Sequence, residues 1–193
     1  MARRTRADME QTRATLLETA RLVFSERGYA DTSMDDLTAQ ANLTRGALYH
    51  HFGDKKGLLA AVVAQIDSEM DARLQALSDA HCDPWLGFTS RCRAYLEMAR
   101  EPEIQRIVLR DARAVLGTPS PQAQMHCVQS LKQLLEQLMA LGLVIQVDPQ
   151  ALASMISGGL TETAFWIAEG DKANDRLPQA LIAMERLLNG IRL

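Results

Sequence analysis

Apolar residues recur at intervals of three and four positions along almost the whole chain, which is the spacing of one face of an α-helix. The first stripe lies within residues 10–27 and is followed by Gly28, a residue type that commonly ends a helix. No stretch of the sequence shows the strict alternation of apolar and polar residues that is typical of a half-buried strand. The periodicity therefore predicts an all-α fold.

Two short helices are expected next, at residues 33–41 and 44–51. Ser33 is followed by an aspartate three residues later, a variant of the capping box, and Thr44 is a favourable N-cap for the second helix. Asn42 lies in the turn between them, where a residue that tolerates the left-handed backbone region is required. Two short helices joined by such a turn predict a helix-turn-helix.

A longer helix is expected at about residues 55–77, with Asp54 as its N-cap. Such a helix extends for ~30 Å or more, which is longer than a three-helix unit of about 50 residues needs. We therefore expect it to join an N-terminal domain of residues 1–54 to a larger helical domain of residues 55–193. Further helices are expected at about residues 84–100, 103–116, 122–141, 149–169 and 175–190.

The charge of the chain is not that of a uniformly basic protein. Its 193 residues carry a net charge of −3, with 21 Lys and Arg against 24 Asp and Glu. Residues 1–56 hold nine of the basic and eight of the acidic residues, so the N-terminal part repels phosphate less than the rest does. This asymmetry fits a nucleic-acid partner for the N-terminal part, and it equally fits chance variation along a helical protein.

The cysteines and the hydropathy pattern favour a reducing, cytoplasmic location. Cys82, Cys92 and Cys127 are widely spaced and form no Cys-x-x-Cys pair, so neither a disulfide framework nor a zinc site is expected. The longest apolar run, residues 138–145, is about half of the ~18 residues that a membrane helix needs. The N-terminal arginines are not followed by the apolar region of a signal peptide. We expect a cytoplasmic protein without a membrane segment, a metal ion or a cofactor.

The second helix of the helix-turn-helix carries long polar side chains. In such a motif this helix enters the major groove of DNA, with its N-terminal residues nearest the base edges. The guanidinium of Arg45 matches the O6 and N7 acceptors of guanine, and Gly46 permits a close approach of the backbone. The further residues expected to contact DNA are Ser33, Thr44, Tyr49, His50 and Lys55. A flexible basic arm of Arg3, Arg4 and Arg6 precedes the motif.

Two other functions compete with DNA binding at this point. Helix-turn-helix packing also occurs in proteins that never touch DNA, so a helical interaction module with a solvated polar face fits the same pattern. An enzyme fits less well, because the sequence lacks the Gly-x-Ser-x-Gly, P-loop, Gly-x-Gly-x-x-Gly and His-Glu-x-x-His motifs. We therefore expect no catalytic residues.

A set of positions within about residues 10–59 is shared with a known family. These positions are Leu16, Leu17, Ala20, Phe24, Gly28, Tyr29, Thr32, Ser33, Leu37, Ala41, Lys55, Leu58 and the run 46–52. As a set they resemble the N-terminal domain of the tetracycline repressor (TetR) family. Asn42 and Asp54 depart from the family pattern, in which glycine and serine are usual, but each suits the same backbone role. The resemblance implies an all-α homodimer, usually a repressor that a small ligand releases from its operator.

The larger domain would then hold the ligand. The run 106–116 resembles one subgroup of the family's regulatory domains, and that subgroup fixes no ligand. Apolar clefts with a few polar groups are where small molecules bind. The candidate lining residues are Trp85, Phe88, Cys92, Tyr95, Arg106, Leu109, His126, Phe165 and Trp166. Because aromatic residues at helical spacing are also the pattern of a plain core, both interpretations stay open for each of them.

The last two expected helices, at about residues 149–169 and 175–190, carry apolar faces and the small residues Ser157, Gly158 and Gly159. Two such helices either meet their symmetry mates in a four-helix interface or pack within one chain, and the resemblance favours the homodimer. The resulting hypothesis is a ligand-responsive repressor of a palindromic operator in double-stranded DNA. An activator with the same fold is the alternative. The effector, the operator sequence and the number of dimers per operator do not follow from the sequence.

Overall fold

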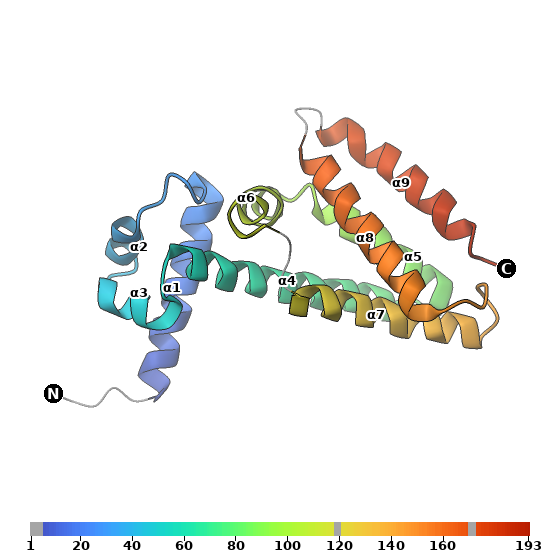
Figure 1. The fold of residues 1–193 in the computed structure, drawn as a ribbon, viewed down its shortest axis with the longest axis horizontal. Helices are drawn as coiled ribbons and strands as arrows, with labels where there is room; N and C mark the ends of the chain where they lie inside the picture. The colour runs from blue at the N-terminus through green and yellow to red at the C-terminus, as the bar shows by residue number, and fades with distance from the viewer. Residues whose placement is uncertain (1–5, 118–120, 170–172) are drawn as a thin grey trace. The chain divides into compact units, whose positions relative to one another are not determined.

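The computed structural model describes residues 6–117, 121–169 and 173–193, leaving out the side chains of residues 121–124, 126 and 173–175. Within these residues the chain is helical, and its only β-type pairing is an isolated bridge between Val144 and Arg192. Figure 1 shows the helices in chain order from α1 to α9. The predicted all-α fold is confirmed. No helix among the described residues is long and apolar enough to cross a membrane.

The chain divides into two compact units. The first consists of residues 1–66 and 106–118, and the second of residues 67–105 and 119–193. The long helix α4 (Lys55–Asp79) therefore starts in the first unit and ends in the second. The boundary predicted between residues 54 and 55 falls at the first residue of α4 and stays a prediction.

The first unit is built on α1 (Arg6–Arg27), α2 (Met34–Gln40) and α3 (Arg45–Phe52). The three helices pack against one another through apolar faces. The side chains buried on them include Leu16, Leu17, Ala20, Val23, Phe24, Leu37, Ala47 and Leu48. Removing such surface from water stabilises the unit by roughly 25 cal/mol per Å² of apolar area.

Local hydrogen bonds set the ends of the short helices, as the sequence predicts. The Ser33 hydroxyl accepts a hydrogen bond from the Asp36 N–H at 3.0 Å, and the Asp36 carboxylate accepts one from the Ser33 N–H at 3.3 Å. The Thr44 hydroxyl accepts one from the Ala47 N–H at 3.3 Å. Asn42 has a φ of 56°, the left-handed conformation expected in the turn. The helix-turn-helix is confirmed.

The second unit combines the end of α4 with α5 (Pro84–Met98), α7 (Pro121–Ala140), α8 (Pro149–Ala168) and α9 (Ala173–Asn189). Helix α8 packs against α5, α7 and α9, and α5 also packs against α7 and α9. The carboxylates of Asp83 and Asp148 cap α5 and α8, and a proline follows each of them. The fully buried core includes Phe88, Leu96, Leu135 and Leu138.

One predicted helix differs in kind from the structure. The sequence predicted an α-helix over residues 103–116, whereas the chain forms a π-helix, η1 (Ile104–Ala112), followed by the short α6 (Arg113–Leu116). Gly117 ends α6 with a φ of 83°, as its residue type predicts. Backbone hydrogen bonds join residues four apart in an α-helix and five apart in a π-helix. Over a stretch as short as η1, the spacing of apolar residues does not distinguish the two helix types. The other helix ends lie within four residues of those predicted.

Candidate functional site

Helix α3 turns its apolar residues inward and its polar residues to the solvent. Ala47 and Leu48 are buried in the core of the first unit. The exposed residues of the helix and its N-cap are Thr44, Arg45, Gly46, Tyr49 and His50. The residues predicted to enter a DNA groove therefore lie together on one accessible helix.

Arg45 is held by an ion pair that the sequence did not suggest. Its Nε and Nη2 atoms both donate hydrogen bonds to the carboxylate of Asp35 on α2. These hydrogen bonds raise the pKa of Arg45 above its ordinary value. Both side chains remain more than half exposed, so the pair orients the guanidinium more than it stabilises the fold. The Nη1 atom takes no part in the pair.

Lys55 begins α4 beside an aromatic ring of the α1–α2 turn. Its Nζ atom lies 4.2 Å from the ring centroid of Tyr29, within the range of cation–π attraction. Partial burial lowers the pKa of Lys55, and the charges of Asp111 and Asp31 oppose this effect. Burial and the charge of Asp54 raise the pKa of the Tyr29 phenol. A neutral tyrosine ring thus supports the predicted phosphate-binding lysine.

The two N-cap hydroxyls differ in what they can offer a phosphate. The Ser33 hydroxyl donates its hydrogen to the Asp36 carboxylate at 2.7 Å, and this bond lowers the pKa of Asp36. The Thr44 hydroxyl acts as an acceptor in its cap, so its hydrogen remains available. Thr44 is therefore better placed than Ser33 to donate to a phosphate oxygen.

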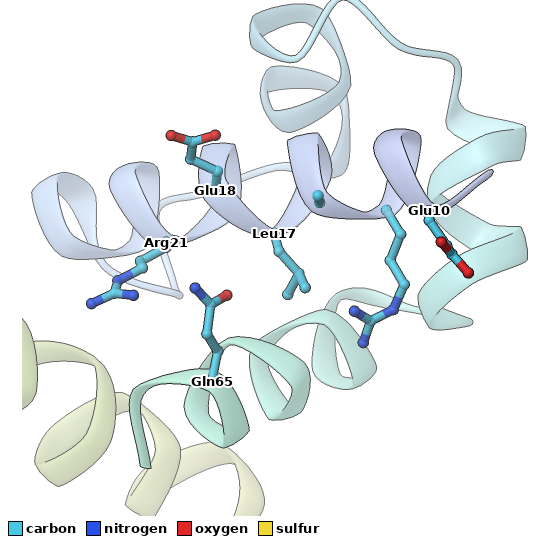
Figure 2. Close-up of a pocket in the computed structure, with 7 residues that line it drawn as sticks. Glu10, Leu17, Glu18, Arg21 and Gln65 are labelled. Carbon is cyan, nitrogen blue, oxygen red and sulfur yellow. The ribbon is translucent and has the colours of Figure 1, made fainter. Parts of the chain in front are cut away.

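An open hollow of about 570 Å³ lies between α1 and α4 within the first unit (Figure 2). It is lined by Glu10, Arg13, Ala14, Leu17, Glu18, Arg21 and Gln65. Figure 2 shows Leu17 of α1 and Gln65 of α4 pointing toward each other across the space between the helices. Because side chains of both charges line the hollow, its surface favours no particular ligand charge.

The predicted basic arm lies only partly within the described residues. Arg6 belongs to the first turn of α1, where its Nε atom pairs with Glu10 at 3.0 Å. Arg3 and Arg4 lie outside the described residues. Helix α1 begins four residues earlier than the apolar stripe predicts, and the ion pair at Arg6 contributes to the stability of this first turn.

The residues predicted to line a ligand pocket do not all belong to one unit. Arg106 and Leu109 belong to the first unit, and the others belong to the second. Trp85, Phe88 and Cys92 of α5 are all buried. Burial raises the pKa of Cys92 to about 12, so this thiol is neutral near pH 7 and does not act as a nucleophile.

The remaining predicted lining residues are less deeply placed. The Tyr95 hydroxyl lies 3.4 Å from the Thr161 hydroxyl, and burial raises the pKa of its phenol. Phe165 is half-buried and Trp166 is 39% exposed, with the guanidinium of Arg176 5.0 Å from its ring centroid. The side chain of His126 lies outside the described residues. Among the described residues no group of His, Cys, Asp and Glu side chains is arranged to hold a metal ion.

The second unit also contains buried charges that the sequence did not suggest. Arg91 is 4% exposed, and its Nη2 atom donates to the Asp71 carboxylate at 2.6 Å and to the Ser130 hydroxyl at 2.9 Å. Its Nη1 atom donates to the Gln75 side-chain oxygen at 3.3 Å. One turn before Asp71 on α4, burial raises the pKa of Asp67 to about 6. Sequence patterns place charged residues on the solvent side of a helix by default, which is why both were missed.

Both halves of the chain match the same protein family. Residues 16–62 match the family model described as bacterial regulatory proteins of the tetR family, and residues 85–191 match the tetracyclin repressor-like C-terminal domain. A crystal structure of a TetR-family transcriptional regulator from Pectobacterium atrosepticum is similar over 98% of each chain, with 71% sequence identity and a TM-score of 0.95.

More distant proteins are similar over part of their length or in fold. The transcriptional repressor BepR of Brucella suis is 32% identical over 107 residues, which are 55% of this chain and 51% of BepR. This chain spans about half of the length of the curated relatives that it matches. A solved gamma-butyrolactone receptor is 28% identical with a TM-score of 0.57, over 95% of this chain and 89% of the receptor chain. The regulators matched here are transcription factors rather than enzymes.

Proposed function

This chain belongs to the tetracycline repressor (TetR) family of bacterial transcriptional regulators. We propose that it binds a palindromic operator as a homodimer and so represses transcription, and that a small molecule releases the homodimer from the operator. The observation that carries the proposal is the exposed polar side of α3, with the paired Arg45 in its first turn. Such a regulator acts where the chromosome lies, so a cytoplasmic location is part of the proposal.

Arg45 is the proposed reader of a guanine. Asp35 engages Nε and one hydrogen of Nη2, which leaves the edge formed by Nη1 and Nη2 to donate to O6 and N7 of the base. The ion pair orients the guanidinium before DNA binds, so less side-chain freedom is lost on binding. Asp35 thereby supports base reading without touching the base that Arg45 reads.

The remaining contacts are proposed to go mainly to the DNA backbone. Lys55 neutralises a phosphate, and the Thr44 hydroxyl donates to one. Gly46 permits close approach of α3, and Tyr49 and His50, one turn along the helix, reach a phosphate or a thymine methyl group. Ser33 contributes through the start of α2, because the N-terminal end of a helix attracts anions.

The proposed homodimer uses α8 and α9. Met155 and Leu187 are each 75% exposed and Ile182 is 61% exposed, so large apolar side chains on both helices face the solvent. Nothing lies within 4 Å of a Cβ atom added at Gly158 or Gly159, which leaves room for the close approach of another helix. Exposed apolar surface of this kind marks interaction sites, and two symmetry-related pairs of helices would cover it.

The proposed effector is a small, mostly apolar molecule. The nine lining residues predicted from the sequence remain its candidate contacts, and the similarity to a gamma-butyrolactone receptor supports a small organic ligand. Because α4 carries Lys55 at one end and belongs to the second unit at the other, a ligand that prefers one arrangement of α4 changes operator affinity by linkage. A coupling of about 1–3 kcal/mol is typical and corresponds to a 5–150-fold loss of affinity.

The test is selection of an operator from random double-stranded DNA, followed by footprinting with the full-length protein. We expect a palindrome whose half-sites lie about one helical turn, roughly 34–36 Å, or a multiple of it apart. If the protein selects no DNA sequence and binds no duplex even at low salt, the interaction module is favoured instead. Transcription from a promoter carrying the operator should fall when the protein is added, and a rise would establish the activator.

A further inference from the structure

Two residues of η1 hold the turn between α1 and α2 within the first unit. Arg106 contacts Arg27 and Asp111 contacts Tyr29, partners that lie 79 and 82 residues earlier in the chain. The turn leads from the end of α1 into the helix-turn-helix, and its Tyr29 ring supports Lys55. A segment from the middle of the chain therefore contacts the backbone beside the predicted phosphate contact.

Arg106 lies directly against Gly28. Its Nη2 atom donates to the Arg27 carbonyl oxygen at 2.7 Å, one of the acceptors left unpaired at the end of a helix. A Cβ atom added at Gly28 would overlap this Nη2 atom, so a larger residue would displace the guanidinium. Gly28 also has a φ of 83°, which favours glycine independently. The end of α1 is thus shaped to receive Arg106.

Asp111 binds the next residue of the turn. Its Oδ2 atom accepts a hydrogen bond from the Tyr29 N–H at 2.7 Å in a partly buried setting. The same oxygen lies 3.8 Å from the Arg106 Nε atom, which is buried and has no hydrogen-bond partner among the described residues. Hydrogen bonds from a backbone N–H to a carboxylate are stronger than those between neutral groups. Asp111 therefore restrains the main chain of Tyr29 and compensates the charge of Arg106.

The Tyr29 ring connects this hydrogen bond to Lys55. The ring packs on Phe24 of the core at a centroid distance of 5.8 Å and supports the Lys55 Nζ atom at 4.2 Å. The charge of Asp111 also acts on Lys55, where it opposes the lowering of the lysine pKa by burial. Tyr29 therefore contacts the Asp111 carboxylate through its N–H and the lysine ammonium through its ring.

We propose that Asp111 is a positioning residue for DNA binding: by holding the Tyr29 N–H it places the ring that supports Lys55 and so directs the ammonium group to a backbone phosphate. The inference rests on the proposed operator binding. The charge of Asp111 acts on Lys55, the proposed phosphate contact, so by charge alone its removal would strengthen DNA binding. A loss of affinity on its removal is therefore the signature of positioning.

The experiment compares full-length variants on two DNA probes. One probe is the duplex selected from the random pool, and the other is a duplex of equal length and scrambled sequence. Asp111→Ala removes both the acceptor and the charge, whereas the matched control Asp111→Asn removes the charge and keeps an oxygen acceptor. Both are combined with Lys55→Ala, and dissociation constants are measured at several salt concentrations. Thermal unfolding of each variant checks that it is folded.

We expect Asp111→Ala to weaken binding of both duplexes by about threefold to fivefold, which lies within the range of one net hydrogen bond and does not exceed the loss expected for Lys55→Ala. Its salt slope should fall by about one, as it does when a phosphate contact is lost. Asp111→Asn should bind within about twofold of wild type or more tightly, because it keeps the acceptor. In the Lys55→Ala background Asp111→Ala should cost less than about twofold, since both act through the same contact.

Three results would overturn the inference. These are wild-type or tighter binding by folded Asp111→Ala, an undiminished loss in the Lys55→Ala background, and an equal loss in Asp111→Asn. If Asp111→Ala does not fold, Asp111→Glu takes its place. This variant keeps the charge and displaces the carboxylate by one methylene group, and the same loss of DNA affinity is expected. When wild type binds DNA and Lys55→Ala weakens it, a failure at Asp111 concerns this inference alone. If wild type binds neither duplex, the proposed function fails.

Discussion

The two units of this chain carry their candidate functional residues in opposite surroundings. In the first unit, Arg45 and Tyr49 lie exposed on α3, and the half-buried Lys55 lies on the half-buried ring of Tyr29. In the second unit, Trp85 and Phe88 are buried in the core. Exposed polar side chains with long reach can be interpreted from the helix that carries them. A buried aromatic side chain is explained by packing alone, so its type and spacing do not distinguish a pocket from a core.

The largest expected effect tests the second half of this comparison. Phe88→Ala should lower the free energy of unfolding by about 3–5 kcal/mol if the ring fills a packed core. A loss below about 2 kcal/mol would indicate an existing cavity beside the ring, as a ligand pocket provides. Urea unfolding measures the loss, and Leu96→Ala is the matched control, because Leu96 is buried on the same helix and was never a pocket candidate.

A smaller effect tests base reading in the first unit. Arg45→Ala should cost about 1–3 kcal/mol of operator affinity and relax discrimination at one base position. Asp35→Ala keeps Arg45 but removes the ion pair that orients it. This variant should therefore lose less operator affinity than Arg45→Ala, with reduced discrimination at the same base position. Titration of the operator and its single-base variants measures both. If Asp35→Ala binds more tightly than wild type, Asp35 competes with the base instead of orienting Arg45.

The partly buried carboxyl group of Asp67 provides a pH-dependent test of the second unit. Its folded-state pKa of about 6 lies above the ordinary value of 3.8 because burial disfavours the charged form. Folding therefore retains a proton that the unfolded chain has lost, and stability falls as pH rises from the ordinary pKa through the folded one. Asp67→Asn should raise the free energy of unfolding by about 1–2 kcal/mol at pH 7.5 and change it little near pH 4. If the free energies of unfolding of variant and wild type, measured with urea, differ by the same amount at every pH, Asp67 has its ordinary pKa in the folded protein.

The smallest expected effect separates phosphate binding from base reading within the first unit. Lys55→Ala should weaken binding to all DNA sequences alike, by about 1 kcal/mol, and lower the salt slope by about one. The measurement is titration of operator and scrambled duplexes over a range of salt. A loss confined to the operator would mean that Lys55 takes part in sequence recognition.

Features of the fold that depend on neighbouring residues follow from the sequence. The Ser33 capping box, the Thr44 cap and the left-handed Asn42 were all predicted and are all present. Each depends on contacts over three or four residues, and these contacts form wherever the local sequence permits. The predicted helix ends are close to those observed for the same reason.

Features that bring distant residues together did not follow from the sequence. Asp35 reaches Arg45 across the turn, and η1 reaches the end of α1 from far along the chain. The π-helical form of residues 104–112 was missed because apolar spacing fits either helix type. Arg106 was placed among the ligand contacts by its residue type, and in the structure it is engaged with the main chain of Arg27. Its role toward a ligand stays a prediction.

The sequence by itself determined the all-α class, the helix-turn-helix and the polar residues of the exposed helix, because periodicity, caps and turn residues act locally. Only the tertiary structure decided which edge of the Arg45 guanidinium is free, which side chains hold the Tyr29 turn, that Arg91 is buried and that Asp67 is partly buried. These outcomes depend on pairs of residues whose separation in space is set by the packing of whole helices. Residue type and spacing along one helix carry no information about that distance.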